Sequence, residues 1–402
     1  MSKQKKASRI PFTPLQRKIL LALASTVGLR MLGLFLVLPV FTLYGLQFTS
    51  SKFLVGLAFG CYGLTMAVLQ IPLGRLSDRI GRRKVLILGM ALFSVGSFLC
   101  AVPHWFPAPL PIAVLIFGRL VQGGGAIISV AFAAVADHIE KERRSTAMAV
   151  LGIPIGAAFV VGIIGGPFLA GLFGTSFLFW LTGILGLSTD VLLIRYLPEV
   201  PPSAAAPTPI GEVMRIRPVV ALAAGGFLMN FFMASFFFYF PLIVTGQHHL
   251  RMTHYYELLL PMMLISGVTM FGFSRGADRG WGRSLSALAF LIFFPSVLLL
   301  FQPGVMGFSP QRLTGMLVAG TLFYIGFTGL EPVLPSLVSR HSPESAYGTS
   351  LGVYNSLQFL GSFAGGSVSG ALSHLSSPRA MMATLVGASL LGALLMLAQP
   401  KN

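Results

Sequence analysis

Apolar runs of about 20 residues follow one another along the whole chain, separated by short segments rich in Pro, Gly and charged residues. Coiled as a helix at ~1.5 Å per residue, such a run crosses the ~30 Å hydrocarbon core of a bilayer. Twelve runs are defined in this way: 17–45, 53–75, 84–102, 111–137, 145–172, 175–197, 218–245, 255–274, 284–302, 312–338, 346–373 and 379–399. Helices are expected throughout, because lipid offers backbone amides no partner and barrel-type alternation is not visible. The pattern predicts an all-α membrane protein with 12 transmembrane helices.

The composition fits a chain surrounded by lipid. Of the 402 residues, 55% are hydrophobic and 10% are charged, whereas a soluble domain carries roughly 25% charged residues. The formal charge of +17 is divided among short loops, so nucleic acid is not expected as a partner. Cys61 and Cys100 lie inside apolar runs and offer neither a disulfide framework nor metal-ligand spacing. Because no nucleotide-binding loop or catalytic cluster is recognisable, we expect no enzyme, no cofactor and no bound metal.

Positive charge is divided unevenly between the two ends of the predicted helices. Of the 28 Lys and Arg residues, 22 flank one end, and four (Lys52, Arg251, Arg312 and Arg379) flank the other. Cytoplasmic loops are the ones enriched in Lys and Arg. We therefore expect a multi-pass protein of the cell inner membrane with both termini in the cytoplasm and anionic lipids at the basic loops. The first apolar run is too long for a signal peptide.

The two halves of the chain repeat with an offset of 200 residues. Asp78-Arg79 aligns with Asp278-Arg279, and the pair Gly165-Gly166 aligns with Gly365-Gly366. This repeat predicts an N-terminal six-helix bundle at 1–197, a Pro/Ala-rich cytoplasmic linker at 198–217 and a C-terminal six-helix bundle at 218–402. Two such repeats are typical of alternating-access transporters, whose substrate site lies at the midplane between the halves.

Three short stretches resemble known transporter motifs. The loop at 74–84 resembles the signature of the major facilitator superfamily, and the matching residues are Gly74, Asp78, Arg79, Gly81, Arg82 and Arg83. "RLVQGGGA" (119–126) is similar to a motif of the drug:proton antiporters. "GIIGGPFLAG" (162–171) is close to the antiporter Gly-Pro motif at Gly162, Gly166, Pro167 and Gly171, with Ala170-Gly171 where a Gly pair is usual.

The resemblance extends over the transmembrane region, where 28–40, 62–82 and 331–361 look like the YajR-type inner-membrane transporters. It implies the fold of that superfamily, two pseudo-symmetric bundles of six helices. YajR-type proteins continue into a small cytoplasmic α/β domain, and the printed chain stops at Asn402, so regulation by such a domain is not carried over.

The loop at 74–84 combines an acid with several bases. Gly74 and Gly81 permit close approach and a tight turn. The resemblance implies that Asp78 caps the start of the run at 346–373, near 345–348, and that Arg82 pairs with Asp137. We interpret these contacts, with Arg79, as a latch that closes the cytoplasmic side of the outward-open state. Asp278 is expected to act in the same way near 145–146. The alternative is a solvated basic loop without a switching role.

Four charged residues lie inside apolar runs, where ionisable groups are candidates for function. Glu331 precedes Pro332, at a bend where a carboxyl could take up and release a proton in each cycle. The alternative is an ionised partner of Arg30 or Arg119 that holds the halves together. The resemblance implies that Arg119 couples proton movement to conformational change, and Arg30 is a further candidate. Acceptors for the two arginines are expected among Gln122, Tyr354, Asn355 and Gln358.

The fourth intramembrane charge is Asp190, which we expect to form a peripheral ion pair with Arg195 one turn and a residue further on. The external segment "QHHLRMTH" contains three histidines without carboxylates, and we expect them to face solvent.

The stretch at 226–241 is rich in Phe and Met and contains Asn230 and Phe231. Such a stripe can form an adaptable lipophilic surface, but helix packing and lipid contact are the preferred explanation for any single Phe. Asn230 lies 200 residues from Arg30, so both are expected to face one cavity. Because Arg30 stands where a cation-binding carboxylate would be useful, a neutral or anionic lipophilic substrate is favoured over a cation.

The sequence predicts a monomeric secondary transporter that exports a small lipophilic or amphipathic compound in exchange for protons. The alternatives are a facilitator or proton symporter for a small polar metabolite and, in a different class, a non-transporting membrane scaffold or sensor.

Overall fold

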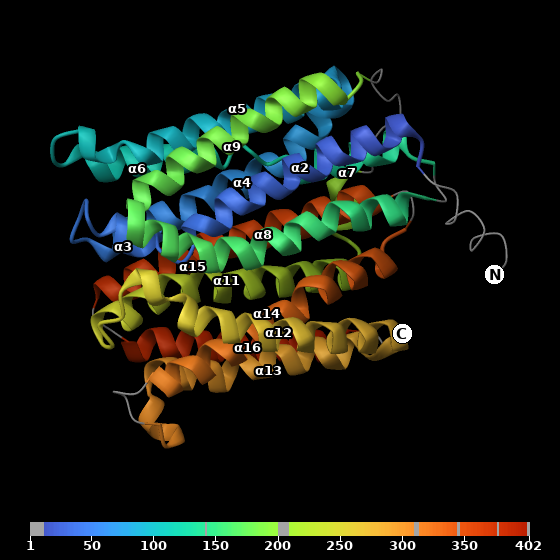
Figure 1. Ribbon diagram of the computed structural model, residues 1–402. Coiled ribbons are helices and arrows are strands. Elements are labelled where there is room, and N and C mark those ends of the chain that lie inside the picture. Colours follow the sequence, from blue (N-terminus) through green and yellow to red (C-terminus); the bar gives the residue numbers. More distant parts are fainter. Residues whose placement is uncertain are drawn as a thin grey trace.

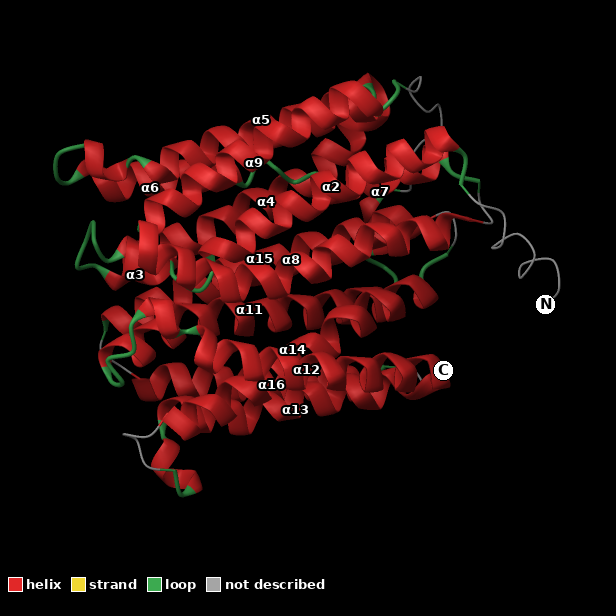
Figure 2. Cartoon of the chain, in the orientation of Figure 1, coloured by secondary structure: helices red, strands yellow, loops and turns green. Residues whose placement is uncertain are grey.

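The computed structural model describes residues 12–140, 143–199, 209–308, 313–343, 346–375 and 378–399, and all regular structure in these ranges is helical (Figure 2). The first half contains α2 (Pro14–Val37), α3 (Phe41–Gly45), α4 (Lys52–Ile80), α5 (Arg82–Ala101), α6 (Leu110–Gln122), α7 (Ile128–His138), α8 (Arg144–Phe173) and α9 (Thr175–Tyr196). The second contains α10 (Ile210–Val213), α11 (Arg217–Gly246), α12 (Tyr256–Gly276), α13 (Gly282–Phe301), α14 (Leu313–His341), α15 (Tyr347–His374) and α16 (Pro378–Leu397). Short helical turns at Pro103–Trp105, Met252–His254, Ala277–Trp281 and Pro303–Met306 join some of them.

The predicted apolar runs are confirmed as helical segments. Nine segments of the described residues are long and apolar enough to cross a membrane, and one of them, Met252–Phe301, contains both α12 and α13. The remaining two predicted runs are the shorter pair α6 and α7, and α15, which is 28 residues long. The prediction of a 12-helix, all-α membrane protein therefore agrees with the fold.

Two of the predicted runs are broken rather than continuous. The run at 17–45 splits into α2 and α3 around Pro39, and the run at 111–137 splits into α6 and α7 at 123–127. Three consecutive glycines begin the second break, and glycine is a poor helix former. A Cβ at Gly123 would lie 2.6 Å from the Tyr62 carbonyl oxygen of α4. The irregular backbone is thus enclosed by protein, which is the setting in which a membrane tolerates it.

The helices run side by side in one stack, and α2 begins at the same end at which α16 finishes (Figure 1). In the first half α2 packs on α8 and α9, and α5 packs on α6 and α9. In the second half α11 packs on α15, and α13 packs on α14 and α16. We name the ends of the stack after residues in their loops: the Arg82 end, where α4 meets α5, and the Gly174 end, where α8 meets α9.

The two halves meet closely toward the Gly174 end. A Cβ at Gly370 of α15 would lie 2.6 Å from the Lys52 carbonyl oxygen and 2.8 Å from Gly56 Cα of α4, so the two backbones touch there. Thr42 of α3 donates a hydrogen bond of 3.5 Å to the Phe237 carbonyl of α11. Backbone contact of this kind closes the Gly174 end.

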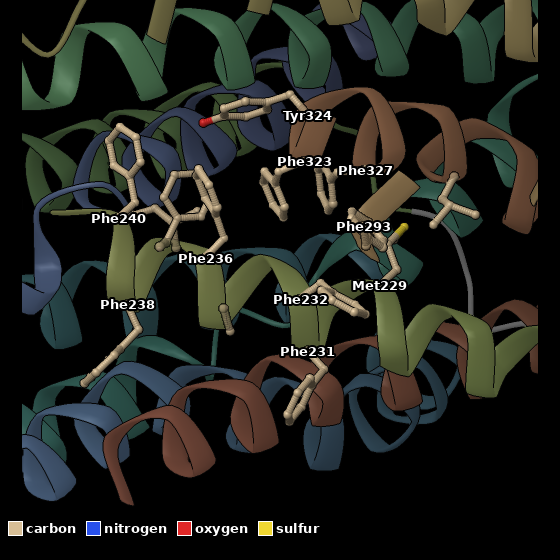
Figure 3. Packing of buried hydrophobic residues seen from close by; sticks show 14 of the residues in the cluster. Met229, Phe231, Phe232, Phe236, Phe238, Phe240, Phe293, Phe323, Tyr324 and Phe327 are labelled. Atoms are coloured by element: carbon tan, nitrogen blue, oxygen red, sulfur yellow. The ribbon is translucent and has the colours of Figure 1, made fainter. Parts of the chain in front are cut away.

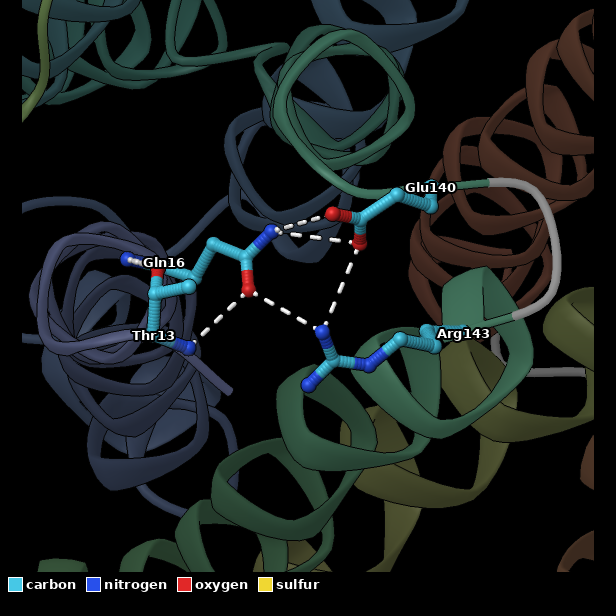
Figure 4. Close-up of polar contacts among 4 residues, drawn as sticks. All are labelled: Thr13, Gln16, Glu140 and Arg143. Carbon is cyan, nitrogen blue, oxygen red and sulfur yellow. Dashed lines mark hydrogen bonds and ion pairs between the residues drawn. The ribbon is translucent and has the colours of Figure 1, made fainter. Parts of the chain in front are cut away.

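At the Arg82 end, the start of α2 is joined to the connection between α7 and α8 (Figure 4). The Thr13 hydroxyl accepts from the Gln16 N–H at 3.2 Å, and the Gln16 side chain accepts from the Thr13 N–H at 3.1 Å, which forms a capping box. Gln16 Nε2 in turn donates to both carboxylate oxygens of Glu140, at 3.1 and 3.2 Å.

Arg143 completes this network. Its Nη1 donates to Gln16 Oε1 at 3.3 Å and to Glu140 Oε2 at 3.5 Å, and its guanidinium lies over the Phe12 ring. Hydrogen bonds from its own backbone and from Gln16 hold the pKa of the Glu140 carboxyl below its usual range. The network therefore stabilises the folded state only while Glu140 is ionised.

We predict that Gly370→Val opens the Gly174 end. The new Cβ collides with backbone atoms, which cannot rotate away, so α4 and α15 have to separate. Spin labels at the exposed positions Ser50 and Leu375, in a chain with Cys61 and Cys100 replaced by Ala, should move apart in double electron–electron resonance. Gly387→Val on α16, where a Cβ meets nothing within 4 Å, is the matched control. An unchanged distance in Gly370→Val would show that this contact does not close the end.

We also predict a pH-dependent loss of stability in Glu140→Gln. Because the pKa of Glu140 is lowered on folding, the stabilisation is present above the unfolded-state value of ~4.3 and disappears as the pH falls through the lower folded-state value. The melting temperature in detergent should fall at pH 7 and converge with that of the wild type under acid conditions. Glu212→Gln on α10 is the control. An equal deficit at both pH values would assign the effect to packing instead.

Candidate functional site

Arg30 of α2 is completely buried in the first half, with 0% of its surface exposed. Its Nη2 donates to the Tyr62 hydroxyl of α4 at 2.7 Å and approaches Met66 Sδ at 3.0 Å. Nη1 lies 3.8 Å from Met31 Sδ, and Nε has no partner in the described residues. The guanidinium lies 5.8 Å from the centroid of the Phe93 ring. One hydroxyl is thus its only strong acceptor among these contacts.

Arg119 of α6 is also buried, with 3% of its surface exposed. Its Nη1 donates to Gln122 Oε1 at 2.5 Å, and Gln122 Nε2 donates to Ser97 Oγ of α5 at 2.9 Å. Its guanidinium lies over the rings of Tyr62 and Phe41, at 4.6 and 4.9 Å from their centroids. Both arginines therefore contact Tyr62: Arg30 donates to its hydroxyl, and the guanidinium of Arg119 lies over its ring.

Glu331 lies in the second half of α14, next to Pro332, and its side chain is exposed. Glu331 interacts electrostatically with Tyr354 of α15, which is 2% exposed and whose hydroxyl has no partner in the described residues. It forms no ion pair with Arg30 or Arg119 among the contacts of the described residues, so the alternative of an ionised bridge between the halves is not seen here.

The polar candidates of the second half lie on α11 and α15. Asn230 is buried, and its Oδ1 accepts from Ser362 Oγ at 3.1 Å, while its Nδ2 has no partner in the described residues. Tyr354 packs against Gly226 of α11. Asn355 and Gln358 are half-buried on α15. Among the described residues, Gln122 is the one predicted acceptor that accepts a hydrogen bond from an arginine.

The phenylalanines of α11 mostly pack inside the second half (Figure 3). Phe236 stacks on Phe323 of α14 with 4.0 Å between ring centroids, and Phe232 stacks on Phe293 of α13 at 4.4 Å. Phe231 points away from this stack (Figure 3), toward α15, and is 7% exposed. Helix packing thus accounts for these rings, which was the alternative explanation of the stripe.

The loop at 74–84 is held by ion pairs around Arg82. Its guanidinium lies 2.5 Å from the Asp78 carboxylate and 2.9 Å from that of Asp137 at the end of α7, as the resemblance implied for Asp137. It also donates to Ser77 Oγ at 2.6 Å. Gly81 ends α4 with φ +100°, a value that favours glycine. Gly74 packs near Ser129 of α7, and Arg79 is exposed.

Three predicted charge contacts differ from the structure. Asp78 forms an ion pair with Arg82, and no contact of Asp78 with the start of α15 is seen among the described residues, which leave out residue 345. Asp278 pairs with Arg340 of its own half at 3.3 Å instead of with the start of α8, where the side chain at 145 is not described. Asp190 is 9% exposed, and its Oδ1 has no partner among the described residues, so no pair with Arg195 forms. Asp190 and Arg195 lie five residues apart on the one helix α9, where only residues three or four apart face each other.

The antiporter-like motif brings α8 against two neighbours. A Cβ at Gly162 would lie 3.0 Å from the Leu36 backbone nitrogen of α2, and Gly166 meets the Leu36 carbonyl. Pro167 lies inside α8, and Gly171 contacts Thr253 between α11 and α12. The glycines therefore act by allowing backbones to approach, within one half and between the halves.

Sequence reasoning missed Tyr62, Met66 and Ser97 as partners of the buried arginines. Tyr62 falls inside the stretch 62–82 that carries the family resemblance, but nothing in its spacing from residue 30 or 119 indicates a contact with either arginine.

Comparisons with known proteins agree with this architecture. The sequence pattern of the Major Facilitator Superfamily matches residues 23–366. The inner membrane transport protein YajR of Escherichia coli (strain K12) is 32% identical over 367 residues, which cover 89% of this chain and 78% of YajR. The multidrug resistance protein MdtL of Klebsiella pneumoniae subsp. pneumoniae is 27% identical over 276 residues, covering 66% of this chain and 62% of MdtL.

The fold is also that of a solved transporter structure. The POT family transporter PepTSo has a TM-score of 0.76 with this chain at 12% identity, covering 96% of this chain and 97% of its own. These proteins are membrane transporters and not enzymes, and the resemblance inferred from the motifs is confirmed. The chain belongs to the Major Facilitator Superfamily.

Proposed function

We propose that this chain is a monomeric, proton-driven exporter in the cell inner membrane, which moves a small lipophilic or amphipathic compound by alternating access. Family membership supports transport, and similarity to the multidrug resistance protein MdtL supports multidrug-type export. The Arg82 end, with its basic residues, faces the cytoplasm and anionic lipid headgroups in this proposal.

The observation that carries the proposal is the unpaired carboxyl of Glu331. It is exposed in the middle part of α14, flanked by Pro332, and no cation lies within ion-pair distance among the described residues. An ionised side chain at mid-membrane costs at least ~2.5–3.5 kcal/mol, and a bound proton removes that cost. Taking up a proton on one side and releasing it on the other is therefore a natural role for this group.

The cluster of Asp78, Arg82 and Asp137 is proposed as one side of a latch. With the Gly174 end closed, Asp78 is held by Arg82 of its own half. When the Gly174 end opens and the Arg82 end closes, the start of α15 approaches, and Asp78 can cap its free amides. A contact of ~0.3–1 kcal/mol at a helix terminus is enough to bias two states of similar free energy.

We predict that Glu331→Gln abolishes coupling to protons. In proteoliposomes with a fluorescent lipophilic substrate and an imposed pH gradient, gradient-driven flux should fall by about tenfold or more, which corresponds to ~1.4 kcal/mol. Substrate exchange without a gradient should continue, because Gln has nearly the same shape. Glu212→Gln is the matched control. Gradient-driven flux that persists in Glu331→Gln would remove Glu331 from the mechanism, and uptake in place of export would favour symport.

We predict that Asp78→Asn shifts the protein toward the state with a closed Gly174 end. Loss of a charged cap should reduce the open population by a factor of ~2–5, in line with ~0.3–1 kcal/mol at a helix terminus. The Ser50/Leu375 spin-label pair measures this population, and the amount of protein in the membrane should stay the same. Arg75→Gln, at an exposed position of the same loop that is not part of the latch, is the control. An unaltered distance distribution together with normal transport would leave this loop as a plain basic anchor.

A further inference from the structure

The first half contains two buried positive charges for which the described residues provide no counter-charge. Arg30 and Arg119 are 0% and 3% exposed, and neither lies within ion-pair distance of a carboxylate in the described residues. Buried charges are normally paired, because removal from water is costly unless an opposite charge and hydrogen bonds compensate. The arrangement therefore lacks a counter-charge within the described residues, and an anion would supply it.

The Arg30 guanidinium has fewer strong hydrogen-bond acceptors around it than it has N–H donors. A guanidinium has five N–H donors. Around Arg30 they meet the Tyr62 hydroxyl and the thioether sulfurs of Met66 and Met31, and sulfur is a weak acceptor. The Nε–H has no acceptor in the described residues.

The surroundings of Arg119 are similar. Its one acceptor is the amide oxygen of Gln122, and the other contacts are the faces of two aromatic rings. Its Nε–H also has no acceptor in the described residues. The titratable groups that act on it electrostatically are Cys100, Tyr62 and Cys61, none of which is an acid of the carboxyl type.

Both arginines that lack acceptors contact the same residue, Tyr62. Its hydroxyl accepts from Arg30, and its ring lies under the guanidinium of Arg119. Apolar surface surrounds this position, since Phe41 covers Arg119 and Phe93 lies beside Arg30. A group that carried a negative charge on a lipophilic body would match both the polar and the apolar part of this environment.

We propose that the transported compound is an organic anion, whose carboxylate binds next to Tyr62 between Arg30 and Arg119. This inference rests on the proposed transport function and specifies its substrate class. The carboxylate accepts hydrogen bonds from both guanidiniums in place of the weak thioether contacts, while the aromatic rings hold the lipophilic body. Charge-assisted bonds of this type are about twice as strong as neutral ones.

The test compares three probes with one skeleton in purified protein: 3-phenylpropionate, 3-phenylpropionamide and 3-phenylpropylamine. The carboxylate should raise the melting temperature, whereas the neutral amide and the amine should have little effect. Arg30→Gln and Arg119→Gln should each remove the response, and Arg17→Gln, at an exposed position on the same helix α2, should keep it. Stabilisation by the amine, no stabilisation by the carboxylate, or a response that survives in both arginine variants would overturn the proposal. An equal shift with sodium chloride would also overturn it, since the site would then hold an inorganic counter-ion only.

A second pair of variants does not require the loss of a buried arginine. Met66 Sδ lies 3.0 Å from Arg30 Nη2, and Glu has nearly the same length as Met. Met66→Glu should supply an internal carboxylate, so the protein without ligand should melt higher than Met66→Gln, and added 3-phenylpropionate should have no further effect. Met66→Gln places an uncharged acceptor at the same position and serves only as the reference for the melting temperature. If Met66→Glu melted below Met66→Gln, the premise of a missing counter-charge would be wrong.

These measurements are made at equilibrium without a pH gradient, which separates them from the flux test of proton coupling. Carboxylate binding without gradient-driven flux would contradict the export proposal and leave the anion site in place. Gradient-driven flux with no preference for the carboxylate over the amide would contradict the anion site and leave the exporter.

Discussion

Hydrocarbon offers a polar group no partner, and the internal organisation of this chain follows from that constraint. Backbone amides are satisfied within helices, and hydroxyls inside the stack donate back to their own helix, as Thr26 does to Ala22 and Ser97 does to Phe93. Arg30 and Arg119 are the charged exceptions in the first half with the least solvent exposure, because a charge cannot be satisfied by one turn of its own helix. Their missing acceptors and counter-charge distinguish the first half from a bundle stabilised by packing alone.

Glycines allow the helices to pack closely against one another. Without water-driven association inside the membrane, small residues let backbones approach and gain van der Waals contact. Gly56 and Gly370 bring α4 onto α15, and Gly162 and Gly166 bring α8 onto α2. The first pair joins the two halves and the second lies within one, so the same chemistry serves both a movable and a fixed contact.

The sequence predicted what depends on composition and failed where tertiary contact decides. Apolar length located every long helix, and the resemblance gave the Arg82–Asp137 pair. The sequence did not give the partners of Arg30, because the spacing of residues along the chain does not show that α2 contacts α4. Repeat symmetry also failed for Asp278, which pairs with Arg340 in its own half. Alignment of the repeats gives the position of an acid along the chain, whereas the packing of the helices decides which base it reaches.

The proton and anion candidates lie in different halves, and α15 is the element that connects them. Tyr354 on α15 interacts with Glu331, and two turns later Ser362 donates to Asn230. Ser362 and Phe359 also pack against Gly63, the residue that follows Tyr62 in α4. Because protein interiors are close-packed, a displacement of α15 has to displace the part of α4 around Gly63 as well. A change in the charge of Glu331 that moves α15 therefore also shifts Tyr62, which contacts both buried arginines.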